Sequence, residues 1–208
     1  EAKKIITTNY LYFGDMLVKL GYADGLVAGA VNSSTNVLRA ALQTIKTAKD
    51  SKIVSSFFIM DVPNCEYGAN GIFLYSDCGM IQNPTSEELV EIANSSAKTF
   101  KQLIEKEPIV AMLSHSTFGS SKHPDVDKVV NAVKLVREKY PNLNLDGELQ
   151  ADAAIVPSVA KSKAPNSKVA GKANVLIFPD LDAGNIAYKL TERLAKAKAY
   201  GPITQGIA

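Results

Sequence analysis

Residues 170–185 limit the possible folds of this chain more than any other stretch of its sequence. Residues 175–178 form a short run of β-branched, aliphatic and aromatic side chains, which is typical of a buried strand. Pro179 ends that strand, because proline has no N–H to donate to a central ladder. Asp182 is then expected to cap a helix. The apolar positions of that helix recur every four residues: Ile186, Leu190 and Leu194.

A strand that leads through a loop into a helix is the unit from which open α/β sheets are built. Such sheets bind ligands at these loops, where the free N–H groups of the first helical turn point outward. The pattern alone fits equally an ordinary strand–loop–helix joint that binds nothing. The stretch therefore predicts an α/β fold without predicting a ligand site.

The rest of the chain alternates in the same way. Strands are expected at residues 25–31, 54–62, 71–77, 109–113, 143–149 and 201–206. Helices are expected at residues 8–20, 37–45, 85–104, 124–139 and 151–159, and residues 161–172 are expected to form an exposed loop. The connection between residues 62 and 71 is too short for a crossover helix and predicts an antiparallel pair. The sequence thus predicts an α/β fold with a doubly wound, mostly parallel sheet and one antiparallel hairpin.

Composition argues against several classes of protein. A net charge of +2 over 208 residues, without a basic block, gives no reason to expect nucleic-acid binding. No apolar run approaches the roughly 18 residues that a membrane span needs, so we expect no membrane association. Cys65 and Cys78 lack metal-binding spacing and are expected to be free thiols in a reducing cytoplasm, although they could close one loop in an oxidising compartment. Nothing at the N-terminus is typical of a signal peptide. Because the sequence has no initiator methionine and stops without tail-like composition, we expect both ends to be cut from something longer.

Three polar loops are expected at strand ends, at residues 32–36, 114–121 and 179–185. In a doubly wound sheet they would share one rim and line one cleft. They offer hydroxyl groups and helix N-termini, a set that suits phosphate or another anion. The basic residues near them are Arg39, Lys122 and Arg193. The alternative is a collection of plain helix caps.

Other chemistries find less support. Neither nucleotide fingerprint, GxGxxG or GxxxxGK[ST], occurs. His115 and His123 lack further residues with metal-ligand spacing, and His123 is expected to begin a helix. Ser114 and Ser116 lie near His115 as a nucleophile would near its base, but without a GxSxG elbow.

Asp146 and Glu148 place two carboxylates beside an expected strand. Such a pair can do acid–base chemistry. It fits equally a turn that carries solvated charges.

Several stretches resemble one enzyme family. They are Leu11-Tyr-Phe-Gly14, Ala23-Asp-Gly-Leu-Val-Ala-Gly-Ala30, Asp146-Gly-Glu-Leu-Gln150, Val169-Ala-Gly-Lys-Ala-Asn-Val-Leu-Ile-Phe-Pro-Asp-Leu-Asp-Ala-Gly-Asn185 and Gly201-Pro-Ile-Thr-Gln-Gly206. In order and spacing they are similar to the phosphate acetyltransferases, or phosphotransacetylases, of the phosphate acetyl/butyryl transferase family. The likeness extends over nearly the whole chain.

This resemblance implies a two-domain α/β enzyme, usually a homodimer. Its substrates would be acetyl phosphate and CoA, and its products acetyl-CoA and inorganic phosphate, formed by direct attack of the CoA thiolate in a ternary complex. No metal or prosthetic group is implied. Residues 1–47 would belong to the first domain and the cleft between domains, residues 48–200 would form the second α/β domain, and residues 201–208 would begin the return to the first.

The resemblance also implies site residues. Ser33, Ser34 and Thr35 match a hydroxyl loop on the phosphate side, and Arg39 matches an arginine associated with CoA or phosphate. Arg193 and Tyr200 match basic and aromatic residues that line the cleft in the family. At Asn32 the family often has histidine, so no imidazole role carries over to that position.

Family members continue into a segment with an Asn-Asp-Leu-Ser-Arg-Gly-type sequence and an aspartate proposed as the base. The catalytic residues would therefore lie beyond Ala208, and we expect the 208 residues alone to be inactive. Two alternatives remain open. One is a non-catalytic module that senses acetyl-CoA, as in fusions behind malic enzymes, and the other is a phosphate butyryltransferase, because pocket volume discriminates acyl chains only modestly.

Overall fold

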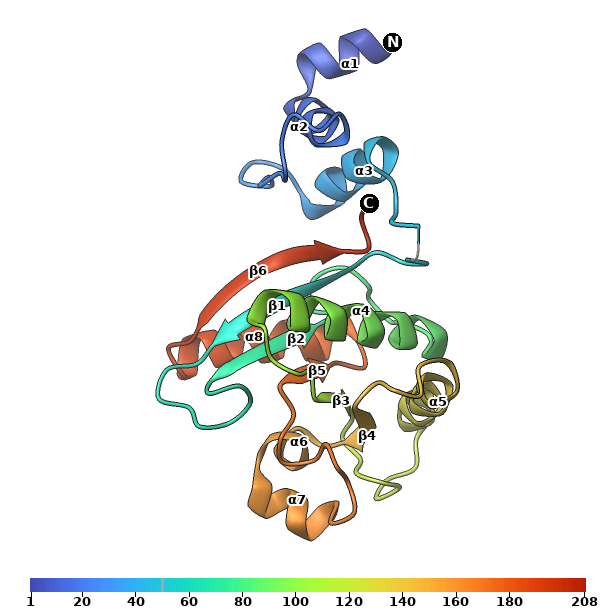
Figure 1. The fold of residues 1–208 in the computed structure, drawn as a ribbon, viewed down its shortest axis with the longest axis vertical. Coiled ribbons are helices and arrows are strands. Elements are labelled where there is room, and N and C mark those ends of the chain that lie inside the picture. Colours follow the sequence, from blue (N-terminus) through green and yellow to red (C-terminus); the bar gives the residue numbers. More distant parts are fainter. Residues whose placement is uncertain (50) are drawn as a thin grey trace. The chain divides into compact units, whose positions relative to one another are not determined.

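A computed structural model describes residues 1–49 and 51–208. The chain separates into two compact units, one of residues 1–54 with 206–208 and the other of residues 55–205 (Figure 1). The first unit contains helices α1 (Ala2–Thr8), α2 (Tyr10–Lys19) and α3 (Ser34–Thr44). An isolated antiparallel bridge joins Thr47 to Ile207.

Two sequence predictions for the first unit have opposite outcomes. The helix expected at residues 8–20 is confirmed as α2, which ends before Gly21, a glycine with φ of 75°. The strand expected at residues 25–31 is wrong, because these residues are irregular and mostly exposed. A strand requires a neighbour for its N–H and C=O groups, and the structure pairs no described segment with this one. Its apolar sequence was therefore a misleading signal.

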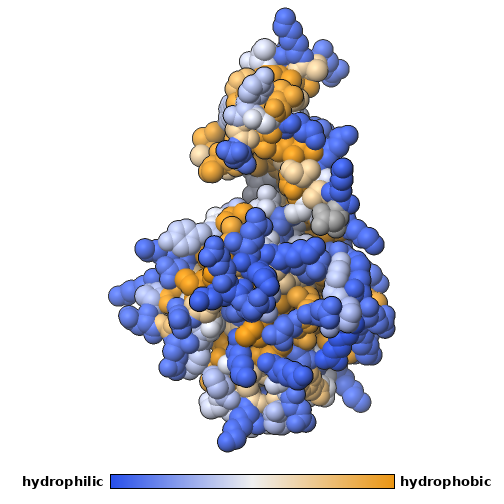
Figure 2. Space-filling view, viewed as in Figure 1, coloured by the Kyte–Doolittle hydropathy of each residue, from blue (hydrophilic) through white to orange (hydrophobic). Residues whose placement is uncertain are grey.

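The first unit buries few of its large apolar side chains and leaves many exposed. Its buried apolar side chains are Leu11, Ala40 and Ile45. Its exposed ones are Ile5, Tyr10, Phe13, Leu20, Tyr22, Leu26, Val27, Val31 and Leu42. Apolar surface therefore gathers over α2 and α3 in Figure 2. A contiguous surface of this kind marks an interaction surface rather than an ordinary solvated face.

The second unit contains a six-stranded sheet in the order β4-β3-β5-β2-β1-β6. The strands are β1 (Ser55–Asp61), β2 (Ile72–Ser76), β3 (Val110–Leu113), β4 (Leu145–Leu149), β5 (Val175–Ile177) and β6 (Lys198–Gln205). The three pairs among β4, β3, β5 and β2 are parallel, whereas β1 pairs antiparallel with both β2 and β6. The mixed, mostly parallel sheet and the β1–β2 hairpin were both predicted and are confirmed.

Helices cover both faces of this sheet (Figure 1). They are α4 (Ser86–Ile104), α5 (Pro124–Lys139), α6 (Ala151–Ile155), α7 (Pro157–Lys163) and α8 (Leu181–Leu194). Successive residues of β1 face opposite sides. Phe58 stacks on Tyr188 of α8 with 4.0 Å between ring centroids, so it faces α8. Ser55, on the other face, accepts a hydrogen bond from Gln205, which also donates to Ser96 of α4. The doubly wound arrangement is therefore confirmed.

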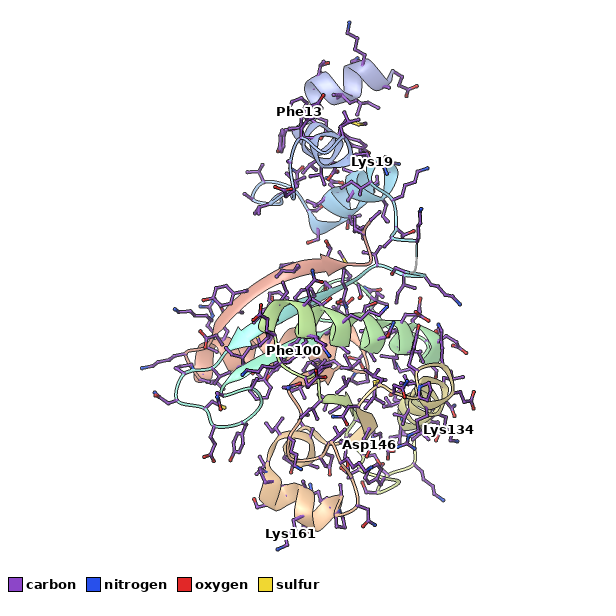
Figure 3. All side chains as sticks on the ribbon, viewed as in Figure 1. Phe13, Lys19, Phe100, Lys134, Asp146 and Lys161 are labelled. Atoms are coloured by element: carbon purple, nitrogen blue, oxygen red, sulfur yellow. The ribbon has the colours of Figure 1, made fainter. Side chains whose placement is uncertain are left out.

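The helix boundaries follow from local chemistry. Helix α4 has the predicted capping box, in which Thr85 and Glu88 bond each other's backbone N–H groups. His123 is the N-cap of α5, as predicted, and its Nδ1 accepts from the Asp125 N–H. The buried face of α4 includes Phe100, which Figure 3 labels. These two helices were therefore predicted correctly from caps and periodicity.

The region between β4 and α8 departs from prediction. The single helix expected at residues 151–159 is two helices, because Val156 precedes Pro157 and is held extended at φ −101° and ψ 115°. The exposed loop expected at residues 161–172 is wrong in part, since α7 continues to Lys163. Ala164, Val169 and Ala170 are also buried in the core of the second unit.

The N-cap of helix α8 lies two residues earlier than predicted, and a different face of the helix packs on the core. Its N-cap is Asp180, whose side chain accepts from the Ala183 N–H, so the predicted cap Asp182 lies in the first turn. Gly184 is buried, and Ala187 and Tyr188 pack on the core. The predicted apolar positions are instead exposed, with 57% for Ile186, 52% for Leu190 and 80% for Leu194. The four-residue repeat therefore marks an outward stripe.

Candidate functional site

The hydroxyl loop predicted at residues 32–36 forms the N-terminus of α3. Ser33 is its N-cap, and the Ser33 hydroxyl accepts a hydrogen bond from the Asn36 N–H at 3.3 Å. The backbone N–H groups of Ser34 and Thr35 belong to the first turn, where a helix supplies no internal acceptor. Their hydroxyl groups are exposed and, among the residues that the structure describes, have no hydrogen-bond partner. The helix dipole adds partial positive charge at this point.

Arg39 adds a full positive charge to the same helix face. It follows Thr35 by four residues, which places both side chains on one side of α3. Its guanidinium group makes one hydrogen bond, to Asn36 Oδ1 at 3.4 Å, and the side chain remains exposed. Hydroxyl groups, free N–H groups and an arginine on one face form a donor set suited to phosphate.

The predicted loops at residues 114–121 and 179–185 lie together at one edge of the sheet in the second unit. They follow β3 and β5, which are parallel neighbours, so their carboxyl ends share an edge. The loop after β2 reaches the same edge, where the Leu181 N–H donates to the Gln82 carbonyl and Asn185 donates to the Cys78 carbonyl. The third predicted loop, residues 32–36, belongs to the other unit.

The donors of the loop at residues 114–121 are used internally. Glu148 is buried, and its Oε1 accepts from the Ser116 hydroxyl at 2.8 Å and from the Gly119 N–H at 2.7 Å. Ser116 in turn accepts from the Ser121 N–H. His115 contacts Ser121 and not Ser116, so the suggested nucleophile–base pair is not formed. Glu148 is neither a solvated charge nor an exposed acid–base group, because it organises this loop.

Sequence analysis missed a second buried carboxylate of this kind. Asp77 follows β2, is 2% exposed and accepts five hydrogen bonds. Two come from the N–H and hydroxyl of Ser56 on β1. Three come from the N–H groups of Gly79, Met80 and Ile81. The signal available in the sequence was an aspartate directly after a strand with a glycine two residues later, Gly79, since both residue types favour turns.

The edge formed by these loops is acidic. A cavity of about 330 Å³ opens there between Gln82, Asn83, Leu181 and three aspartates, Asp125, Asp180 and Asp182. Lys128 lies beside it and is occupied by the Asn83 side chain at 2.6 Å and the Pro179 carbonyl at 2.8 Å. A site with this charge disfavours phosphate. Within the described residues, the charge and the occupied donors of these loops therefore argue against an anion site in the second unit, and anion binding at α3 stays a prediction.

Arg193 and Tyr200 lie away from these loops. Arg193 is in the last turn of α8, eleven residues beyond Asp182, which corresponds to about 16 Å along a helix. Tyr200 is on β6 opposite Ile59, toward the end of the sheet where β2 begins. Both side chains are exposed. The structure places them near the opposite edge of the sheet from the loops, so within this unit they form no common site with residues 179–185.

The cysteines are not reactive groups of this site. Both are free, and Cys78 is fully buried. Burial, together with the neighbouring Asp77 charge, raises the pKa of the Cys78 thiol far above its usual range. Among residues 1–49 and 51–208, no three His, Cys, Asp or Glu side chains are grouped so as to hold a metal ion. None of the described helices combines the length and the apolar character needed to cross a membrane.

The fold defines the class of protein as an open, mixed α/β sheet covered on both faces, accompanied by a second, helical unit. The model of the phosphate acetyl/butaryl transferase family matches residues 1–208. A phosphate acetyltransferase from Acetivibrio thermocellus is 64% identical over 208 residues, covering 100% of this chain and 63% of the relative. One from Thermoanaerobacterium thermosaccharolyticum is 59% identical over 207 residues, with the same coverage.

Solved structures agree with these relatives. A phosphotransacetylase from Streptococcus pyogenes superposes with a TM-score of 0.87 at 47% identity, covering 94% of this chain and 58% of that one. The chain therefore belongs to the phosphate acetyl/butaryl transferase family. It spans about three-fifths of the length of the curated relatives it matches.

Proposed function

We propose that this chain is part of an enzyme that interconverts acetyl phosphate and CoA with acetyl-CoA and inorganic phosphate. The observation that carries the proposal is 64% identity to a phosphate acetyltransferase over all 208 residues. The donor set at the N-terminus of α3 supports it, because acetyl phosphate, phosphate and CoA all carry phosphoryl groups. Two free thiols also fit the reducing cytoplasm where we place the protein.

In this reaction the thiolate of CoA attacks the carbonyl carbon of acetyl phosphate. A carbon–sulfur bond forms, the bond between the acetyl carbon and the phosphate oxygen breaks, and phosphate leaves with the electron pair. The proton of the thiol passes to a base. Because charge develops on the carbonyl oxygen and the leaving phosphate, fixed donors and cations lower the barrier most effectively. Holding both substrates together supplies much of the remaining acceleration.

We assign the phosphoryl group to the α3 terminus. Ser33, Ser34 and Thr35 would supply hydroxyl and N–H donors, and Arg39 would neutralise charge on the phosphoryl oxygens or on CoA. Arg193 and Tyr200 would contact a different part of the bound substrates, since they lie near the far end of α8 from the acidic loops. No metal or prosthetic group is part of this proposal.

The first test compares two proteins in the same assay. Acetyl-CoA formation from acetyl phosphate and CoA is followed by thioester absorbance, with the 208-residue chain and with its complete reading frame. We expect turnover from the complete protein and none above background from the 208 residues, which span only 63% of the length of their relatives. Rates near those of the complete protein would refute the inactivity of the shorter chain.

The same assay with the complete protein tests the proposed function. If it forms no acetyl-CoA, the proposed activity is wrong. Binding of acetyl-CoA without turnover would support the sensing module instead. Faster turnover of butyryl phosphate would make it a butyryltransferase.

We further propose that the exposed stripe on α8 is where two copies of the protein associate. Ile186, Leu190 and Leu194 continue a series that begins at Asp182, each step being four residues. In an antiparallel pair of α8 helices, Asp182 of one copy lies beside the basic last turn of the other, which contains Arg193. Apolar side chains in the middle with opposite charges at the ends make the surface complementary to itself.

Substituting Leu190 tests this surface. Leu190→Glu is expected to convert a dimer into a monomer in light scattering after size exclusion, because it places a charge against the apolar stripe of the other copy. Leu103→Glu is the matched control, since Leu103 lies on α4 with the same exposure of 52%. Equal behaviour of the two variants would count against the α8 interface.

A further inference from the structure

A cationic cavity lies in the unit of residues 55–205, apart from the acidic cavity described above. It has a volume of about 310 Å³ and opens between the last turn of α5, the start of β4 and the loop before β5. Its polar lining is formed by Arg137, Asn144, Asp146, Asn166 and Lys168. It lies where β3 and β4 begin, since Val110 pairs with Leu145 there. It is therefore at the edge of the sheet opposite the loops that follow β2, β3 and β5.

One carboxylate organises the cationic groups of this cavity. The Asp146 side chain is 13% exposed, and its Oδ1 accepts from Arg137 Nη2 at 2.7 Å and from the Gly147 N–H at 3.0 Å. Its Oδ2 accepts from the Ser167 hydroxyl at 2.6 Å. Figure 3 labels Asp146 on β4. With three donors bound, the charge of this carboxylate is already compensated, so it opposes an incoming anion only weakly.

Asp146 also fixes the backbone that carries Lys168. Ser167, held by Asp146, accepts hydrogen bonds from the N–H groups of Val169 and Ala170. Lys168, which lies between Ser167 and Val169 in the sequence, therefore belongs to an ordered turn. The same carboxylate thus orients Arg137 directly and Lys168 through Ser167, which is the kind of support that preorganises a binding site.

The donors of the cavity are free to bind a ligand. Within residues 1–49 and 51–208, Lys168 and the side chains of Asn144 and Asn166 have no hydrogen-bond or ion-pair partner, and Arg137 uses one donor. The surroundings reinforce the positive charge, because the sequence between Asp152 and Asp180 contains four lysines and no carboxylate. Of these lysines, Lys163 is paired with Asp152.

We infer that this cavity binds the phosphoryl end of a small molecule, either a diphosphate or a phosphate ester. The charges of Arg137 and Asp146 offset each other, so Lys168 gives the cavity its net positive charge. The remaining N–H groups of the Arg137 fork and the two amides provide further donors, a set that matches the several oxygens of a phosphoryl group. The volume lies at the lower limit of ordinary small-molecule sites, so the ligand is larger than a single ion and smaller than a dinucleotide. The residues of this site belong to the unit of residues 55–205, whereas α3 belongs to the other unit, and the inference does not depend on the proposed reaction.

Titration of the 208-residue chain with pyrophosphate, followed by amide chemical shifts, tests the inference. We expect saturable shifts in residues 143–146 and 166–169. Lys168→Gln is expected to raise the dissociation constant roughly five- to tenfold, the cost of one charge-assisted contact at a partly exposed site. Lys161→Gln removes the same charge from α7, where the side chain points away from Asp146 in Figure 3, and is expected to leave the constant unchanged.

Two further variants separate a built site from a charged surface. Ser167→Ala leaves the charge of the cavity unchanged but releases the turn that carries Lys168, and is expected to weaken binding about threefold. Arg39→Ala is expected to have no effect on these shifts. The inference is overturned if the shifts do not saturate, or if Lys161→Gln weakens binding as much as Lys168→Gln. It is also overturned if the shifts disappear with Arg39→Ala, or if citrate shifts these residues and pyrophosphate does not.

Discussion

Replacing Asp77 by alanine is expected to lower the free energy of unfolding of residues 55–205 by roughly 3–5 kcal/mol, as for other buried charged groups whose partners are left unpaired. The carboxylate accepts five hydrogen bonds and is 2% exposed. Removing it strands the N–H groups of Gly79, Met80 and Ile81 near the core. It also detaches Ser56 of β1 from the loop that follows β2. The loss therefore affects the hairpin as well as the loop.

Hydrogen exchange of the β1 and β2 amides under increasing urea measures this change in the intact chain. Asp182→Ala is the matched control, because Asp182 is an exposed aspartate at the same edge of the sheet and an exposed substitution usually changes stability by about 0.5 kcal/mol or less. Asp77→Asn should fall between the two, since it keeps one acceptor oxygen and loses the other. A loss below about 1 kcal/mol for Asp77→Ala would show that water replaces the carboxylate.

Asp77 and Glu148 also show what the sequence does not reveal about the loops. Each carboxylate is bound by donors from another segment, Ser56 lying 21 residues before Asp77 and Ser116 lying 32 before Glu148. No local pattern encodes such pairs. The hydroxyl-rich loop at residues 114–121 was correctly placed after a strand, but its hydroxyls serve Glu148 instead of a ligand. The composition of a loop therefore predicts which hydrogen-bond donors it contains. It does not predict whether those donors are already bound within the protein.

Most of the second unit was predictable because its signals are local. The capping box at Thr85 and the proline after His123 specify helix starts through neighbouring residues alone. The short connection between β1 and β2 required an antiparallel hairpin. Sheet order and the parallel neighbours of β5 depend on contacts distant in sequence, so only the class of sheet followed from the pattern.

The two wrong expectations about apolar segments share one cause. Residues 25–31 and the stripe of Ile186, Leu190 and Leu194 are apolar but exposed within their own units. Hydrophobic periodicity predicts that one face of a segment will be buried. It does not predict whether that face packs on its own unit or on another part of the assembled protein. The chain spans 63% of the length of a curated relative, and the proposed pairing of two α8 helices would cover the stripe of Ile186, Leu190 and Leu194. The two apolar segments that were wrongly predicted to be buried are therefore the places where we expect contacts with other parts of the protein.

Arg39→Ala in the complete protein is expected to lower kcat/KM for acetyl-CoA formation by roughly 10²–10³-fold, the usual effect of removing one electrostatic group from charge developing in a transition state. This expectation rests on the proposed function. Arg39 is exposed and shares a helix face with Thr35, where free N–H and hydroxyl groups already favour an anion. Alanine has the higher helix propensity, so α3 itself is not weakened. Lys3→Ala, an exposed charge removed from α1 of the same unit, should leave the rate unchanged.

The substrate dependence of the rate shows which molecule Arg39 contacts. If Arg39 binds CoA, the KM for CoA rises, and an unchanged KM for CoA excludes that contact. If it binds the phosphoryl group only as charge develops, kcat and kcat/KM fall together while both KM values stay constant. Arg39→Lys keeps the charge but loses the planar fork, so partial rescue indicates that charge dominates and no rescue indicates bidentate binding. Unchanged kcat/KM for both substrates would remove Arg39 from the site and leave the family assignment intact, because that assignment rests on the whole chain.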